Sequence, residues 1–580
     1  MADYFNTGMQ LYLDHLVDWK ALLEIRSGGA VDVEAEVGAY RTILETAGAL
    51  AASFEPEARK NWAAEAEPTP DGGAQSPPHI RQAYEQLREA GLISLTVGEQ
   101  YGGYGLPALL NGIFLEMISR ADASLMMVVG LQTGAASDIE KFGSEEVKEA
   151  FLPRFTSGEI EGSMDLTEPE AGSDLGGIAT RVTDLPDGRV QVDGQKIYIS
   201  NGGAEVHLVL ARDDDKFDQS RGTTQGLSLV LVPRHLEDGS SNGVKVTRLE
   251  KKMGIHGSAT CEVVFDKAIG HRLGAAGGGF RAMLDLMNAA RLGVASQALG
   301  ICEAALHDAV GYAHERKQFG KAIAEQPMVM SMLANMAVDI EAVRALLYRT
   351  YRLLDLNLAR EAALANGDLG EAEATAMRAE LERDTARVRL LTPLCKYFAT
   401  ETCDDVTRDA MQVFGGIGFT MDADVAKLHA DSLILTVYEG TSEIQASFAL
   451  REIGKGALGV VFKEIRSELA AMTDDPLRAD LAKRVEGMAK RVEESMGVLF
   501  SDISYALLRA KLLTEMVIDV IASCELLEQV AADRDRLDIA AGFIARHAIK
   551  ADYLNRRIAE NADGLVERDA RLVAKAASQA

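Results

Sequence analysis

The spacing of apolar residues changes twice along this chain, and that change limits the folds it can form. Up to about residue 160, apolar residues recur every three or four positions, as at Ile80, Tyr84 and Leu87, which is typical of amphipathic helices. Between about residues 161 and 275 the period becomes two, which indicates β-strands. From Phe280 the helical period returns. The sequence therefore predicts an α+β protein with β structure between two helical regions.

The length of 580 residues exceeds what a single hydrophobic core usually supports, so several domains are expected. Turn-forming residues at 68–78 and the glycine at 456 mark two boundaries. We expect a helical N-terminal extension at 1–79, a helical domain at 80–160, a β domain at 161–275, a helical domain at 276–455 and an additional C-terminal helical domain at 456–580. Within the fourth of these, residues 354–389 are typical of a long helical hairpin, interrupted at Gly367 and Asp368.

The charge balance and the cysteines narrow the partners and the compartment. The chain has 60 Lys and Arg against 88 Asp and Glu, a formal net charge of −28, which repels phosphate backbones and acidic membrane surfaces. We therefore expect no nucleic acid partner. The five cysteines are scattered without a CxxC pair, which favours a reducing compartment. We expect a cytoplasmic protein with no signal peptide, membrane span or metal site.

Two segments of the β region carry polar groups suited to a flat heterocyclic ligand. In MDLTEPEAGSD, the hydroxyls of Thr167 and Ser173 could donate hydrogen bonds, although an ordinary surface loop rich in turn formers has the same composition. In KIYISNGG, alternation places Tyr198 and Ser200 on one face of a strand, so the ring could lie against the ligand while the hydroxyl bonds its edge. A half-buried strand ending in an Asn-Gly turn is the alternative.

Two later segments combine a cation, aromatic rings and glycines. RKQFG begins at Arg316, whose guanidinium suits a pyrophosphate, and it contains Phe319, which offers a face to adenine. QVFGGIGF begins at Gln412, and its run from Gly415 to Gly418 lets a ligand approach the backbone closely. The alternatives are a basic helix end stopped by glycine for the first segment and a glycine-capped helix end for the second.

A fourth kind of segment, LTVYEGTSEIQ, contains a candidate general base. Glu439 follows an apolar run and precedes Gly440 and Thr441, so we expect it at a helix start in partly dry surroundings. Desolvation there would raise the pKa of its carboxyl toward the range useful to a general base. The alternative is an acidic residue that only complements the helix dipole.

LTEPEAGSD, YISNGG, RKQFG, QVFGGIGF and YEGTSEIQ occur in the order typical of the acyl-CoA dehydrogenase family, which the chain closely resembles from about Arg81 to Arg451. Chance agreement at five separated sites is implausible. The resemblance implies an N-terminal helical domain, a barrel-like middle β domain and a C-terminal four-helix bundle, with FAD between the last two. It also implies an enzyme that oxidises an acyl-CoA thioester to a trans-2-enoyl-CoA.

The resemblance also implies roles for single residues. Glu439 would remove the α-proton of the thioester while FAD accepts the β-hydride, and its backbone N–H would polarise the carbonyl as part of an oxyanion hole. The residues expected to bind FAD are Thr167, Ser173, Tyr198, Ser200, Arg316, Phe319, Gln412, Gly416, Thr441 and Glu443, and those expected to bind the substrate are Ser173, Arg291, Gly440 and Arg451. In the family, Arg316 and Phe319 reach the FAD of a neighbouring subunit, so a homo-oligomer, dimer or tetramer, is implied.

Departures from the family pattern refine this hypothesis. Ala290 occupies the position where some members place their base, so Glu439 is the one candidate base that the motifs offer. Tyr198 stands where the family often has Trp. The two extensions and the 354–389 hairpin resemble those of larger bacterial members, including 3-methylmercaptopropionyl-CoA dehydrogenases. Electrons would pass to an electron-transfer flavoprotein. The alternatives are an acyl-CoA oxidase reoxidised by oxygen and a non-catalytic assembly or scaffold protein on the same fold.

Overall fold

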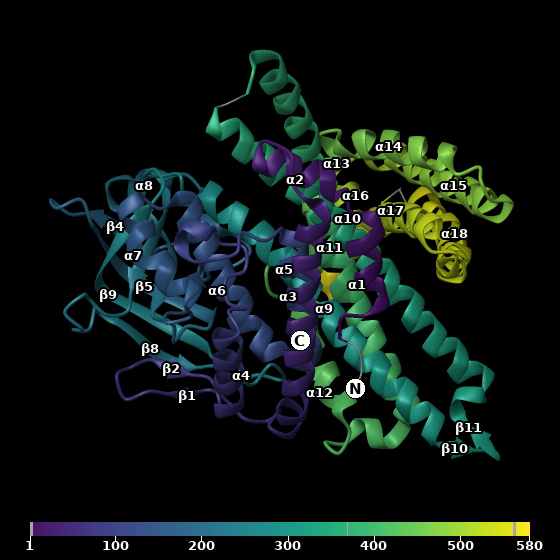
Figure 1. The fold of residues 1–580 in the computed structure, drawn as a ribbon, viewed down its shortest axis with the longest axis horizontal. Helices are drawn as coiled ribbons and strands as arrows, with labels where there is room; N and C mark the ends of the chain where they lie inside the picture. The colour runs from purple at the N-terminus through teal and green to yellow at the C-terminus, as the bar shows by residue number, and fades with distance from the viewer. Residues whose placement is uncertain (1–3, 368, 561–563, 580) are drawn as a thin grey trace. The chain divides into compact units, whose positions relative to one another are not determined.

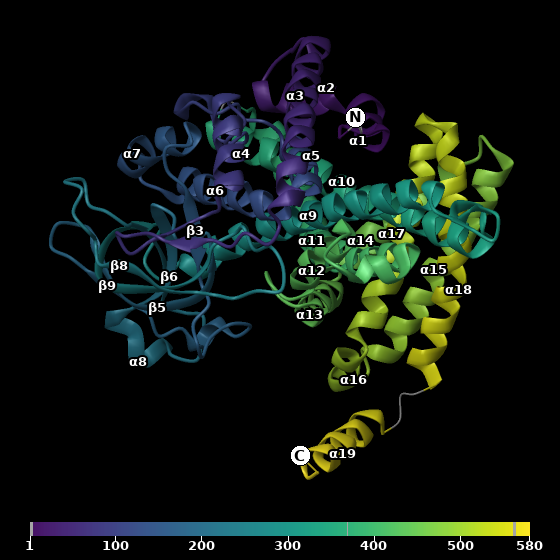
Figure 2. The same ribbon diagram turned by 90° about the horizontal axis from the view of Figure 1, so that it is seen from below.

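The computed structural model describes residues 4–367, 369–560 and 564–579 and forms two compact units (Figures 1 and 2). Unit 1 consists mainly of Ile43–Ala304 with Phe419–Ile434. Unit 2 consists of Phe5–Thr42, Ala305–Gly418 and Leu435–Ala580. The expected C-terminal helical domain at 456–580 therefore shares a unit with Phe5–Thr42, and the five-part division stays a prediction.

Five strands close into a barrel in unit 1. β4 (Arg181–Asp184) pairs β5 (Val190–Ser200), β5 pairs β9 (Thr260–Leu273), β9 pairs β7 (Leu227–Pro233), β7 pairs β6 (Val206–Asp213), and β6 returns to β4. β3 (Gly162–Asp165) lies beside β6, and β8 (Val244–Leu249) lies beside β9. The barrel-like middle domain is thereby confirmed.

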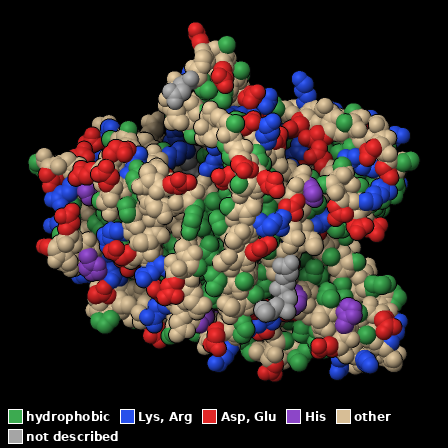
Figure 3. Space-filling model, in the orientation of Figure 1, with side chains coloured by type: hydrophobic (Ala, Val, Ile, Leu, Met, Phe, Trp, Pro, Cys, Tyr) green, Lys and Arg blue, Asp and Glu red, His purple; other side chains and the backbone are tan. Residues whose placement is uncertain are grey.

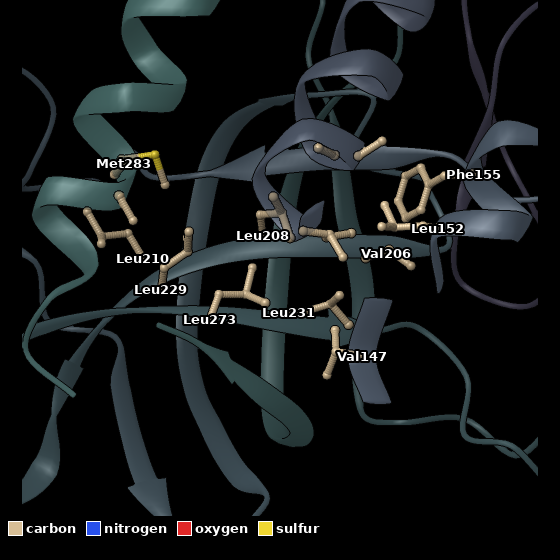
Figure 4. Close-up of a cluster of buried hydrophobic side chains, with 14 of the residues drawn as sticks. Val147, Leu152, Phe155, Val206, Leu208, Leu210, Leu229, Leu231, Leu273 and Met283 are labelled. Atoms are coloured by element: carbon tan, nitrogen blue, oxygen red, sulfur yellow. The ribbon is translucent and has the colours of Figure 1, made fainter. Parts of the chain in front are cut away.

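β6 and β7 are buried along almost their whole length. Because side chains alternate along a strand, these two strands contribute to two different cores. One set packs outside the barrel with helix residues in the cluster of Figure 4, which includes Val206, Leu208, Leu210, Leu229, Leu231, Leu273, Val147, Leu152, Phe155 and Met283. The alternate set, which includes Val209 and Val230, fills the barrel interior. This double burial explains why β7, with the sequence LSLVLVP, is apolar except at Ser228.

The other elements of unit 1 are mostly helices. They are α4 (Pro78–Glu89), α5 (Ala108–Ala121), α6 (Ala123–Phe142), α7 (Glu145–Thr156), α8 (Phe217–Ser220) and α12 (Asp424–Ser432), with β1 (Glu67–Pro68) and β2 (Ala74–Gln75) as a small hairpin. Two helices contribute to both units, α3 (Val33–Lys60) and α9 (Gly279–Glu315). Asp122 caps α6 by accepting hydrogen bonds from the N–H groups of Ser124 and Leu125, which fixes where that helix begins.

Unit 2 is almost entirely helical. Its elements are α1 (Thr7–Leu11), α2 (Trp19–Ser27), α10 (Pro327–Asn366), α11 (Glu371–Phe414), α13 (Ser442–Gly454), α14 (Ala457–Ala471), α15 (Pro476–Leu499), α16 (Ile503–Leu508), α17 (Ala510–Ala532), α18 (Leu537–Glu560) and α19 (Leu565–Ala577), with the short hairpin β10 (Lys317–Gln318) and β11 (Lys321–Ala322). α10 packs on α11 as the expected hairpin, and α15, α17 and α18 lie side by side (Figures 1 and 2). α10 ends at Gly367, whose φ of 78° only glycine adopts readily, and Asp368 lies outside the described residues. The α+β class is confirmed.

On the face drawn in Figure 3, Lys and Arg side chains are scattered among Asp and Glu. Within the described ranges, no helix is both long and apolar enough to cross a bilayer. In the same residues, no group of three or more His, Cys, Asp or Glu side chains could hold a metal ion.

Candidate active site

Glu439 lies in a strained turn that precedes α13. Its φ is 55° and that of Gly440 is 90°, so two successive residues adopt the left-handed conformation. The sequence placed Glu439 at a helix start, but α13 begins at Ser442 with Thr441 as its cap, accepting from the N–H of Ile444 at 3.4 Å. A left-handed residue with a side chain is costly and persists where its surroundings enforce it.

Two buried side chains enforce this turn by binding its carbonyl groups. Lys396 of α11 is fully buried, and its Nζ donates a 2.9 Å hydrogen bond to the carbonyl of Gly440. Gln445 of α13 donates to the carbonyls of Glu439 at 2.9 Å and Gly440 at 3.1 Å. Sequence reasoning missed both residues, although a lysine inside the apolar run TPLCKYFAT is a signal that could have flagged one.

Glu439 and the neighbouring Tyr438 are both half-buried. Burial raises the pKa of Tyr438 well above its usual range, and the negative charge of Glu439 raises it further. The neutral phenol therefore adds no charge next to the carboxyl. The turn has little free space, because a Cβ on Gly440 would lie 2.9 Å from Nε2 of Gln445.

The remaining predicted residues of this segment make other contacts. Glu443 is exposed and accepts a 3.3 Å hydrogen bond from Lys511 of α17. Its own backbone N–H and then Lys511 hold the pKa of Glu443 below its usual range. Arg451 is 57% exposed, pairs with Glu452 at 3.1 Å and lies 5.1 Å from the ring centre of Phe448. Its guanidinium is thus accessible to an anionic ligand.

RKQFG forms a tight hairpin after α9 rather than the helix end offered as its alternative. β10 and β11 are joined by Phe319 and Gly320, whose φ values of 54° and 82° are those of a two-residue turn. The turn leaves the ring of Phe319 93% exposed, with Arg316 also exposed. An aromatic ring held this far out of any core is suited to contact a ligand or another chain.

QVFGGIGF ends α11 as the sequence indicated. Gln412 is exposed in the last turn, and Gly415 follows the helix with a φ of 68°. Among the described residues, no atom lies within 4 Å of where a Cβ would stand on Gly415 or Gly416. The backbone here is therefore open to close approach.

In unit 1, the two predicted segments lie next to each other. The N–H of Ile197 donates to the carbonyl of Thr167 at 2.9 Å, which joins the loop to β5. Thr167 and Ser200 are half-buried, and Ser173 is exposed. Tyr198 is 60% exposed, but it has a φ of 59° at a bulge between Lys196 and Ile199, which interrupts the alternation that sequence reasoning assumed.

A buried ion pair fixes this arrangement. Lys196 is fully buried and donates to Oε1 of Glu168 at 2.8 Å, while the Glu168 carboxylate also accepts from the N–H groups of Ala179 at 2.7 Å and Thr180 at 3.0 Å. Burial would raise the pKa of Glu168, but Lys196 and these donors lower it below its usual range. Both residues stand inside the predicted segments, yet their pairing was not foreseen.

Arg291 lies on α9 and is 3% exposed. Its Nη1 donates to Oδ1 of Asn288 at 2.9 Å, so the guanidinium is held by its own helix. Its expected contact with the substrate stays a prediction.

Two other features of unit 1 lie apart from the predicted residues. Ser163, Asp165 and His207 form a hydrogen-bonded cluster with distances of 2.6 to 3.0 Å, but all three are closed to solvent and join β3 to β6. A cavity of about 320 Å³ opens beside β8, and it is lined by residues that include Glu65, Arg248, Lys252, His256 and Ser258. No predicted site residue lines it.

Most of the chain matches the models of one protein family. The chain matches the family models described as acyl-CoA dehydrogenase N-terminal domain at 45–159, middle domain at 163–268 and C-terminal domain at 277–367 and 366–454. The chain therefore belongs to the acyl-CoA dehydrogenase family and is an FAD-dependent oxidoreductase.

Three known proteins illustrate the extent of the similarity. The 3-methylmercaptopropionyl-CoA dehydrogenase of Ruegeria pomeroyi is 30% identical over 519 residues, which cover 86% of this chain and 84% of the relative. A chain solved in work on the electron transferring flavoprotein of Acidaminococcus fermentans is 28% identical, with a TM-score of 0.59, covering 71% of this chain and 97% of that one. An acyl-CoA dehydrogenase of Bacillus anthracis complexed with FAD shares the fold, with 23% identity, a TM-score of 0.73 and coverage of 92% and 91%.

The described residues fit the chemistry of FAD. Arg316 offers a fork for a pyrophosphate, Phe319 an exposed ring for adenine and Gly416 an open stretch of backbone. Tyr198 offers a second exposed ring on the barrel. Each group is of a chemical type that FAD can contact, and its assignment to FAD stays a prediction.

Proposed function

We propose that this enzyme oxidises an acyl-CoA thioester to a trans-2-enoyl-CoA, with Glu439 as the base. The observation that supports the proposal most is the left-handed turn at Glu439, held through its carbonyls by Lys396 and Gln445. Glu439 takes the α-proton, the electrons of that C–H bond form the new C=C bond, and the β-hydrogen leaves with its electron pair. FAD, when bound, supplies the acceptor for that hydride.

The residues proposed to bind FAD are Thr167, Ser173, Tyr198, Ser200, Arg316, Phe319, Gln412, Gly416, Thr441 and Glu443. Because Phe319 is 93% exposed, we propose that it binds the FAD of a second copy in a dimer or tetramer. Replacing Phe319 by Ala should then weaken FAD retention and oligomer formation together, measured by flavin content and by light scattering.

The proposals for the substrate and for the electron acceptor are supported by the comparisons and by exposed groups. Ser173, Gly440, Arg291 and Arg451 are proposed to bind the CoA thioester, with Arg451 the accessible cation. The long similarity to a 3-methylmercaptopropionyl-CoA dehydrogenase makes short sulfur-containing acyl chains the first substrates to test. An electron-transfer flavoprotein is the proposed acceptor, supported by the related chain from the Acidaminococcus fermentans work.

Anaerobic bleaching of the flavin tests the proposal. The wild-type enzyme is mixed with short, branched, sulfur-containing, aromatic and long acyl-CoAs, beside Glu439→Gln and, as a control, Glu361→Gln on the exposed face of α10. We expect Glu439→Gln to retain yellow flavin and lose bleaching, and Glu361→Gln to behave as wild type. Unchanged bleaching by Glu439→Gln would refute the base. Stoichiometric peroxide in air would instead identify an oxidase.

A further inference from the structure

Lys511, near the start of α17, pairs with two carboxylates that flank the first turn of α13. Its Nζ is 3.3 Å from Oε1 of Glu443 and 4.0 Å from Oε1 of Glu401. Glu401 in turn accepts a hydrogen bond from the hydroxyl of Ser442, the first residue of α13. One cation from the C-terminal helices therefore neutralises two acidic groups attached to the turn that follows Glu439.

The groups that face Lys511 include the carboxylates of Glu401 and Glu443 and the ring of Tyr397. Its Nζ lies 5.6 Å from the ring centre of Tyr397 on α11, and that phenol donates to Glu515 of α17 at 3.1 Å. Burial, and then Glu515 and Glu401, raise the pKa of Tyr397 above its usual range. Lys550 of α18 contacts Glu515 at 3.3 Å and does not pair with Glu401 or Glu443 in the described residues.

The helix that carries Lys511 is firmly anchored at a distance from it. Glu525, which is 14 positions further along α17 and so about 21 Å away, accepts from Arg349 of α10 at 3.0 Å and from the hydroxyl of Tyr12 at 3.0 Å. Most residues of α17 are buried. A rigid helix held by α10 and by the N-terminal segment thus presents a fixed cation to α13.

We propose that Lys511 is a positioning residue for Glu439, so that the C-terminal helices are part of the scaffold of the active site. The inference rests on the proposed function, because it assigns Lys511 its role through the proposed base. An exposed ion pair contributes little by itself. Loss of Lys511, however, leaves Glu401 and Glu443 as uncompensated neighbours of the first turn, and their repulsion shifts the turn that orients Glu439.

The test compares Lys511→Met with Lys511→Arg, the double variant Lys511→Met/Glu401→Gln, and a control, Arg491→Met. Arg491 also forms an ion pair on the C-terminal helices, with Asp552 at 2.8 Å, and its side chain is 43% exposed against 39% for Lys511. Two quantities are measured on holoenzyme: amide hydrogen exchange of residues 436–446 without substrate, and the limiting rate of flavin reduction by acyl-CoA.

We expect Lys511→Met to speed exchange in 436–446 about tenfold, to leave exchange in α15 unchanged, and to slow flavin reduction about three- to tenfold with little change in KM. Lys511→Arg should recover most of that loss because it restores the cation, and the double variant should recover much of it because it removes one of the two repelling carboxylates. Arg491→Met should match wild type. Unchanged exchange and rate in Lys511→Met, or a loss that neither Lys511→Arg nor the double variant recovers, would overturn the inference. Amide exchange is measured without substrate. It therefore tests whether Lys511 holds the turn even if Glu439 proves not to be the catalytic base.

Discussion

The ammonium group of Lys396 lies 2.9 Å from the carbonyl oxygen of Gly440, the residue that follows the proposed base. Lys396 is fully buried on α11, so the bond forms away from solvent. A buried lysine is costly unless it is well partnered. Lys396 therefore holds the carbonyl of Gly440 in place instead of interacting with solvent.

Lys396→Met should slow flavin reduction by acyl-CoA at least tenfold while flavin content stays near that of wild type. The methionine removes the donor to Gly440 and frees the turn, and a shift of about 1 Å in a catalytic group can cost as much as a hundredfold in rate. Stopped-flow absorbance under anaerobic conditions measures the rate. Lys490→Met, an exposed position on α15, serves as the control and should not change it. An unaltered rate in Lys396→Met would exclude this role.

Gly440→Ala should lower the free energy of unfolding by about 1–3 kcal/mol. Its φ of 90° is strained for any residue with a Cβ, and the new methyl group would lie 2.9 Å from Nε2 of Gln445. Gly459→Ala, inside α14 with no described atom within 4 Å of its Cβ position, should be neutral or stabilise by up to about 1 kcal/mol. Denaturant unfolding followed by circular dichroism compares them, and equal effects would contradict the prediction.

Lys196→Met should destabilise the protein by about 3–5 kcal/mol, because it leaves the carboxylate of Glu168 buried without its cation. Arg181→Gln breaks a comparable but exposed pair with Asp214 on the same barrel, and it should cost less than about 1 kcal/mol. The same unfolding measurement applies. If both variants cost equally little, Lys196 does not fix the loop that carries Thr167 and Ser173.

Stability should fall as pH rises through neutrality because of Glu161. Burial, and then the charge of Glu205, raise the pKa of Glu161 from 4.5 to about 7, so the folded protein holds a proton that the unfolded chain has lost. The resulting stability, of order 1–3 kcal/mol, is fully present below pH 4.5 and is lost as pH rises through about 7.

Thermal unfolding from pH 5 to 8.5 checks this effect. Glu161→Gln cannot ionise, so the midpoint of wild type should fall relative to this variant as pH rises. Glu170→Gln, at an exposed position, should follow wild type. Parallel profiles for wild type and Glu161→Gln would show that Glu161 is not responsible.

The sequence predicted the fold well where periodicity is local. The change from helical to strand spacing located the barrel, and the glycine at 367 located the bend between α10 and α11. Strict alternation failed at Tyr198, because a bulge depends on the pairing of β5 with β9 and not on β5 alone.

The candidate site was predicted in part. The motifs singled out Glu439, Arg316 and Phe319, whose roles stay predictions, and the structure adds the left-handed turn and the exposed hairpin around them. The groups that hold the turn were missed, since Lys396 and Lys511 lie 43 or more positions from Glu439 in the sequence, and only tertiary packing brings them beside its turn.

Exchange of the α-proton measures the proposed base most directly. The enzyme is incubated in D₂O with an acyl-CoA whose β-carbon is replaced by sulfur, so that no β-hydride can leave, and deuterium at the α-carbon is followed by mass spectrometry. If Glu439 is the base, wild type exchanges the α-proton and Glu439→Gln, with its flavin retained, loses at least 99% of that rate. Exchange by Glu439→Gln at the wild-type rate would show that another group removes the proton.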